Sequence, residues 1–165
     1  MQNKLTRKDA LDLLSKVELD EVIAHTITAM KIAGSLGKIA GLSDSEADLL
    51  QTACALHAIK PNSLDSCNYL LSKGWGRDVC MLVLHSREVI NLSGLPEHLH
   101  KLHKILIIAN ICSDSNGCLR NVKSGLAEIL KTLKTPEEKA KAQLMADSAK
   151  IWLDELCGTN KLIYS

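Results

Sequence analysis

The hydrophobic positions of this chain recur with the spacing of amphipathic helices along nearly its whole length. In residues 19–40, for example, apolar side chains return about every 3.6 positions, as one buried helix face requires. Runs of β-branched and aromatic residues that would indicate strands are scarce. The pattern predicts an all-α fold, a compact helical domain of seven to eight helices. The expected helices span about 6–17, 19–40, 43–59, 62–71, 77–90, 96–112, 119–131 and 135–156.

Helix starts are marked by local capping signals. Ser43 and Glu46 form the pattern Ser-x-x-Glu, in which each side chain can bind the backbone N–H of the other residue. Thr135 and Glu138 repeat this pattern before the last helix. No linker, repeat or low-complexity stretch interrupts the series. We therefore expect residues 1–165 to form one domain.

Composition and charge narrow the class of protein. The chain has 165 residues, 46% of them hydrophobic, and contains no Phe, so Leu, Ile, Val, Ala and Met must build the core. The net charge is +1, so the sequence shows neither the excess of basic residues expected for nucleic-acid binding nor a polybasic segment for a membrane surface. No apolar run is long enough to cross a membrane, and the start of the chain lacks a secretory apolar region. The expectation is a soluble, cytoplasmic protein.

The six cysteines do not form a metal-binding motif. None of them stands in a Cys-x-x-Cys pair, so a structural zinc site is not indicated. Each lies in an apolar helical context, and we expect small buried hydrophobes in a reducing compartment.

Two histidines stand in segments that resemble a known family. His25 begins the run His-Thr-Ile-Thr-Ala-Met-Lys-Ile-Ala, and His57 lies in Leu-His-Ala-Ile near the end of the next helix. Residues 107–117 read Ile-Ile-Ala-Asn-Ile-Cys-Ser-Asp-Ser-Asn-Gly. With these segments, residues 25–117 resemble the HD-domain superfamily of metal-dependent phosphohydrolases. The resemblance implies an HD-domain-like helical fold.

The resemblance also implies a degenerate metal site. The family holds a divalent metal with a His, a His-Asp pair and a distant Asp, ligands that suit Mn, Fe, Co, Ni or Zn. His25 and His57 match two of these ligands, whereas Ala58 replaces the Asp of the pair and Asn110 replaces the last Asp. Without a carboxylate to neutralise a dication, burying the ion is costly. We expect either no metal or a weakly bound one at His25, His57 and Asn110.

Four further residues are candidates for the same pocket. Asp114 lies four residues after Asn110, one helical turn further if the helix continues, and Glu88 lies three residues after His85. Either carboxylate would be a substitute ligand for a displaced ion. His85 matches an exposed histidine in compact members of the family. Lys60 offers a cation for a small anionic or nucleotide-like ligand.

Three more histidines crowd the start of the helix 96–112. His98 and His100 point about 200° apart on a helix, so His98, His100 and His103 cannot share one ion. We expect a solvated helix start rather than a metal cluster.

Three functional hypotheses stay open. The first is a divergent HD-domain-like protein that has lost efficient phosphohydrolase activity and serves as a ligand-binding, regulatory or interaction module. The second is an active metal-dependent phosphatase or phosphodiesterase for a nucleotide-like substrate, with a rewired metal site. The third is a generic all-α interaction domain. A second copy of the chain, giving a homodimer, is a further candidate partner, although the aliphatic pattern singles out no dimer surface.

Overall fold

Helix α6 (His100–Cys112) is the buried centre of the fold, and α2, α3, α7 and α8 pack on it. The computed structural model describes residues 5–17, 19–87 and 94–157. Within this part the elements are α1 (Arg7–Leu14), α2 (Asp20–Ile39), α3 (Asp44–Leu56), α4 (Ser63–Ser72), α5 (Arg77–Leu84), a 3-10 turn (Glu97–Leu99), α6, α7 (Val122–Thr132) and α8 (Pro136–Cys157). The predicted all-α class is confirmed.

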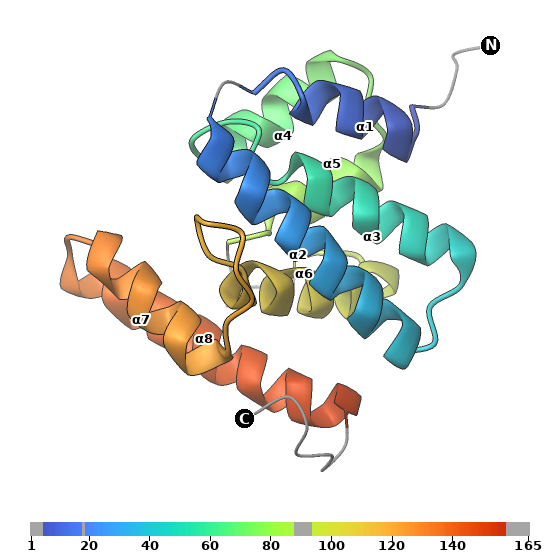
Figure 1. Cartoon of the computed structure of the whole chain (residues 1–165). Helices are drawn as coiled ribbons and strands as arrows, with labels where there is room; N and C mark the ends of the chain where they lie inside the picture. The colour runs from blue at the N-terminus through green and yellow to red at the C-terminus, as the bar shows by residue number, and fades with distance from the viewer. Residues whose placement is uncertain (1–4, 18, 88–93, 158–165) are drawn as a thin grey trace.

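The helices form two groups on either side of α6. Helices α1, α3, α4 and α5 lie together, α2 crosses α6, and α7 and α8 form a pair at one edge of the molecule (Figure 1). Helices α7 and α8 pack on each other and on α6. The short connection of residues 133–135 makes them a hairpin, which we call the α7–α8 hairpin.

The predicted capping signals are confirmed by the structure. The Ser43 N–H donates to the Glu46 carboxylate at 2.8 Å, and the Glu46 N–H donates to Ser43 Oγ at 3.4 Å. Thr135 and Glu138 exchange the equivalent bonds at 3.0 and 3.1 Å. These bonds satisfy N–H groups that have no partner within the helix. Local chemistry therefore determines where α3 and α8 begin.

Two helices are shorter than their hydrophobic pattern predicts. Helix α5 ends at Leu84 instead of near position 90, because Ser86 Oγ donates to the Val83 carbonyl and the chain turns. Helix α7 begins at Val122 rather than near 119, because Leu119 pairs with Ser113 in an isolated antiparallel bridge. Residues 88–90 of the longer α5 prediction lie outside the described residues.

The prediction of a solvated helix start holds for part of this segment. Glu97, His98 and Lys101 are exposed and His100 is partly buried. His103, in contrast, is 1% exposed, packs edge-on against Trp152 of α8 at 6.3 Å between ring centroids, and lies 2.9 Å from the His85 carbonyl through Nε2. The sequence pattern did not indicate that α8 covers His103.

All six cysteines are free; Cys118 is exposed and Cys157 partly so, while the other four are buried as predicted. No helix in the described ranges is both long and apolar enough to cross a membrane.

Candidate functional site

A cavity of about 740 Å³ lies between the α7–α8 hairpin and the ends of α2, α3 and α6. Cavities of this size hold small organic ligands. Residues far apart in the sequence line it together: His25, His57, Ala58, Asn110 and Asp114. The structure thus brings to one place all three residues of the implied metal site, together with Ala58 and one of the four further candidates, Asp114.

The two histidines face each other at the inner end of the cavity. His57 follows the last turn of α3 and is 3% exposed, and His25 lies in the second turn of α2. Their Nε2 atoms are 3.3 Å apart. His57 Nδ1 lies 2.7 Å from the Cys54 carbonyl, and His25 Nδ1 lies 3.1 Å from the Ser113 carbonyl. We call His25 and His57 the imidazole pair.

The contacts of the two rings can all be satisfied by neutral imidazoles. The Cys54 carbonyl only accepts, so His57 Nδ1 donates to it and His57 Nε2 is an acceptor. His25 Nδ1 lies 3.1 Å from the Ser113 carbonyl and 3.0 Å from Ser113 Oγ, a hydroxyl that can donate to it. When Ser113 Oγ donates, His25 Nε2 carries the hydrogen and donates to His57 Nε2 at 3.3 Å.

Both rings are held in the neutral form. Burial lowers the pKa of His57 to about 3, and the positive charge of Arg87 acts in the same direction. Burial also lowers the pKa of His25, although its bond to the Ser113 carbonyl opposes the shift. An additional proton on either ring is therefore disfavoured at neutral pH.

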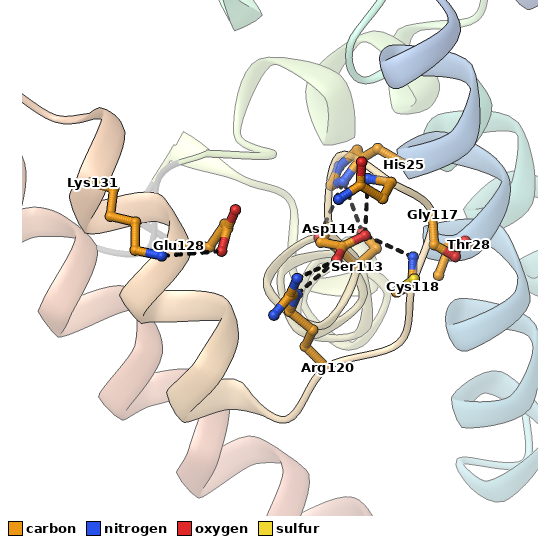
Figure 2. Close-up of polar contacts among 10 residues, drawn as sticks. His25, Thr28, Ser113, Asp114, Gly117, Cys118, Arg120, Glu128 and Lys131 are labelled. Carbon is orange, nitrogen blue, oxygen red and sulfur yellow. Dashed lines mark hydrogen bonds and ion pairs between the residues drawn. The ribbon is translucent and has the colours of Figure 1, made fainter.

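Asp114 does not act as a substitute ligand, because its carboxylate is already bound. Helix α6 ends at Cys112, so Asp114 lies in the following loop and not one helical turn after Asn110. Its side chain, 1% exposed, accepts from Arg120 at 2.6 and 2.7 Å and from the backbone N–H groups of Asn116 and Cys118 (Figure 2). The hydrogen bond from Cys118, with those from Arg120, lowers the pKa of Asp114.

The loop after α6 is tied to α2, which places Ser113 beside His25. Thr28 Oγ1 donates to the Gly117 carbonyl at 2.6 Å, and Figure 2 shows this contact next to the Asp114 cluster. Gly117 has φ +75°, and a side chain there would press on the Ala24 carbonyl. The Asp114–Arg120 pair is therefore structural: it shapes the loop that orients His25.

The two positions at which the family would carry carboxylates are neutral here. Ala58 is partly buried and contributes only a methyl group to the cavity wall. Asn110 donates from Nδ2 to the Ser86 carbonyl at 3.2 Å, which identifies Oδ1 as the acceptor end. That Oδ1 is buried and has no hydrogen-bond partner within the described structure.

The remaining candidates lie elsewhere. The His85 side chain does not line the cavity, and Lys60 lies 4.6 Å over the Tyr69 ring, also outside the cavity lining. Glu88 lies outside the described residues. Arg87, which donates to the Pro61 carbonyl at 2.8 Å, does line the cavity.

The sequence analysis missed one wall of the cavity. The α7–α8 hairpin contributes apolar and charged side chains, among them Glu128, Ile129, Leu133, Lys141 and Met145. No motif marks these residues, which lie 71 to 120 positions from the imidazole pair in the sequence. Only the docking of the hairpin on α6 brings them there.

The donor set does not fit the metal centre of an HD phosphohydrolase. The imidazole pair supplies two nitrogens, and the nearby family positions supply a methyl group and an amide. Across the described residues, no three His, Cys, Asp or Glu side chains gather closely enough to hold a metal ion. A catalytic zinc ion needs three protein ligands, and the HD resemblance implies that two of the metal ligands are carboxylates.

Acid is expected to weaken the fold through His57. The unfolded chain binds a proton near pH 6.5, whereas native His57 stays neutral down to about pH 3, so the unfolded state binds more protons in that window and stability falls as the pH drops. At about pH 5 this residue should reduce the free energy of unfolding by about 2 kcal/mol relative to pH 8. Urea unfolding of wild type and His57→Gln at both pH values measures it. An equal pH dependence in the two proteins would mean that native His57 is protonated at pH 5.

Comparison of the chain with protein-family models, with curated proteins and with solved structures gives no match.

Proposed function

We propose that this protein is a non-hydrolytic, HD-domain-like module that binds a small molecule in the cavity beside the imidazole pair. The observation that carries the proposal is the convergence of His25 and His57 on a cavity of about 740 Å³ without a third metal ligand among the described residues. This arrangement offers a ligand a cavity and two imidazole rings, but it lacks the ligands for a metal ion that would activate a water molecule for hydrolysis.

Further support comes from which residues line the cavity. His25, His57, Ala58 and Asn110 line it together, as the HD resemblance implies for a degenerate site. The Asp114 carboxylate is engaged by Arg120 at 2.6 Å and is not free to replace the missing ligands. Binding would then regulate an attached or associated partner. A cytoplasmic location and a homodimer stay predictions.

The experiment starts from protein purified without a chelator or a metal-affinity tag. Elemental analysis should find no stoichiometric Mn, Fe, Co, Ni or Zn. With each metal added, p-nitrophenyl phosphate and bis(p-nitrophenyl) phosphate should not be hydrolysed above the rate in buffer.

The matched control is His57→Ala. Metal-dependent hydrolysis by the wild type that disappears in His57→Ala would contradict the proposal and establish the second hypothesis, an active phosphohydrolase with a rewired site. Hydrolysis that persists in His57→Ala would indicate a contaminating enzyme.

A further inference from the structure

We infer that the cavity takes an aliphatic monocarboxylate, whose carboxylate binds the Arg87 guanidinium and whose hydrocarbon chain packs against the α7–α8 hairpin. This inference rests on the proposed function and names the chemical class of the ligand.

Arg87 lines the cavity and has no counter-ion within the described residues. Its Nη1 donates to the Pro61 carbonyl at 2.8 Å, whereas its Nε and Nη2 have no hydrogen-bond partner in the same part of the chain. Burial lowers the pKa of Arg87, which means that the guanidinium has lost part of its contact with water. The side chain is still exposed enough for a ligand to reach it. An anion bound there would replace the lost interactions.

The imidazole pair has no N–H group left for an anion, so the head group depends on Arg87. The charge of Arg87 lowers the pKa of both His25 and His57, which places the guanidinium near the pair. His57 Nδ1 donates to the Cys54 carbonyl. The hydrogen of His25 goes either to His57 Nε2 or to the Ser113 carbonyl. In both arrangements the two neutral rings use their N–H groups within the protein.

A carboxylate matches one guanidinium better than a phosphate does. Two parallel N–H groups of a guanidinium bind both oxygens of a carboxylate, and one positive charge balances one negative charge. A phosphate monoester carries about 1.5 to 2 negative charges at pH 7. The excess charge would lie in a cavity that Glu21, Glu128 and Glu138 also line. Lys141, the other cation of the lining, is already paired with Glu137 at 2.9 Å.

The acidic residues of the lining do not make it a site for a cation. Asp114 already forms an ion pair with a guanidinium, and Glu138 accepts from two backbone N–H groups before α8. Glu128 lies 3.7 Å from Lys131, and Figure 2 shows this pair apart from the Asp114 cluster. Glu21 is exposed in the first turn of α2, where water and salt screen its charge. An ammonium group would also be repelled by the guanidinium near the imidazole pair.

The hydrocarbon chain follows from the wall that the hairpin contributes. Ile129 of α7, Leu133 after it, and Ala142 and Met145 of α8 line the cavity, as does Val22 of α2. Aliphatic groups bound there would gain about 25 cal/mol per Å² of apolar surface removed from water. A linear chain with a carboxylate at one end therefore combines the two requirements of this cavity.

The test compares four probes of one chain length, octanoate, octylamine, octan-1-ol and octyl phosphate, by isothermal titration calorimetry on the full chain. Octanoate should bind at least about tenfold more tightly than each of the other three, because only its head group matches the guanidinium in both charge and geometry. Equal affinity for octan-1-ol would show that the charge of the head group contributes nothing, and tighter binding of octyl phosphate would identify a phosphate site. Either result overturns the inference.

Two variants test the role of the guanidinium. Arg87→Gln removes the charge but keeps an N–H donor, and it should weaken octanoate binding at least about tenfold. Arg77→Gln is the matched control, because it removes the same charge at an exposed position outside the cavity lining, and it should leave the affinity unchanged. Both substitutions lie at exposed positions, so both variants should fold. An equal effect of the two substitutions would mean that octanoate responds to the net charge of the protein, and it overturns the inference.

Two variants of α8 locate the hydrocarbon chain. Met145→Trp fills the cavity and should abolish octanoate binding, whereas Leu144→Trp, at the neighbouring exposed position, should leave it unchanged. Loss of binding in both variants, or in neither, would place the probe outside the cavity and overturn the inference.

The outcomes separate this inference from the proposed function. Binding of none of the four probes overturns the monocarboxylate class. The hydrolysis assay with His57→Ala decides the proposed function by itself, because it does not depend on any of these probes.

Discussion

Replacing both Ala58 and Asn110 with aspartate is expected to turn the cavity into a metal site, with Zn²⁺ or Mn²⁺ bound about 100-fold more tightly than by the wild type, or ~2.7 kcal/mol. Both positions line the cavity that holds the imidazole pair. Two carboxylates would neutralise a dication where burial otherwise makes its charge costly. The Nδ1 atom of each histidine lies within hydrogen-bond distance of a backbone carbonyl, to which it can donate once Nε2 binds the metal.

Isothermal titration calorimetry with each metal measures the gain. The matched control is the single variant Ala58→Asn, in which Asn110 is unchanged. Asparagine has the size of aspartate without its charge, so this control should bind metal as weakly as the wild type. If the double variant binds no better than the control, Ala58 and Asn110 do not face the imidazole pair as the HD resemblance implies.

Gly125→Ala is expected to destabilise the protein by about 3 kcal/mol, although alanine is the better helix former in isolation. A Cβ at position 125 would overlap with the backbone carbonyl oxygen of Ile111 in α6. A backbone atom cannot rotate away as a flexible side chain can. Helix α7 must therefore move off α6, and the wall of the cavity that it forms moves with it.

Urea unfolding followed by circular dichroism measures this loss. Gly76→Ala is the matched control, because nothing lies within 4 Å of a Cβ there, and it should cost less than about 1 kcal/mol. Equal stability of Gly125→Ala and the control would show that α7 does not approach α6 as closely as described. Because the hairpin forms one wall of the cavity, Gly125→Ala should also lower the affinity for any ligand that binds there.

The parts of the fold that could be predicted are those with local causes. Ser43 and Glu46 cap α3 whatever surrounds them, because both partners lie within four residues of each other. The end of α5 was predicted too late, since its apolar pattern continues past Leu84, where Ser86 binds the Val83 carbonyl. Periodicity identifies a buried face, but it does not show where tertiary packing stops a helix.

Of the candidate site, the part that could be predicted best from the sequence was its two histidines. His25 and His57 were found from the HD resemblance, and the structure places their Nε2 atoms 3.3 Å apart. Asp114 lines the cavity as expected, but α6 ends before it and its carboxylate binds Arg120, which lies beyond a turn whose path depends on contacts with α2. The burial of His103 was missed for the same kind of reason: Trp152, which covers it, lies 49 positions away in the chain.

The sequence by itself determined the helices, their caps and the absence of carboxylates at positions 58 and 110, because these depend on residue identity and on neighbours within a few positions. Only the tertiary structure decided that Asp114 is bound by Arg120 and that the Nε2 atoms of the imidazole pair lie 3.3 Å apart. It also decided that side chains of the α7–α8 hairpin, many of them aliphatic, line the same cavity as this pair. The physical reason is that hydrogen-bond partners and burial are set by distances in space, and here those distances join residues up to about 90 positions apart along the chain.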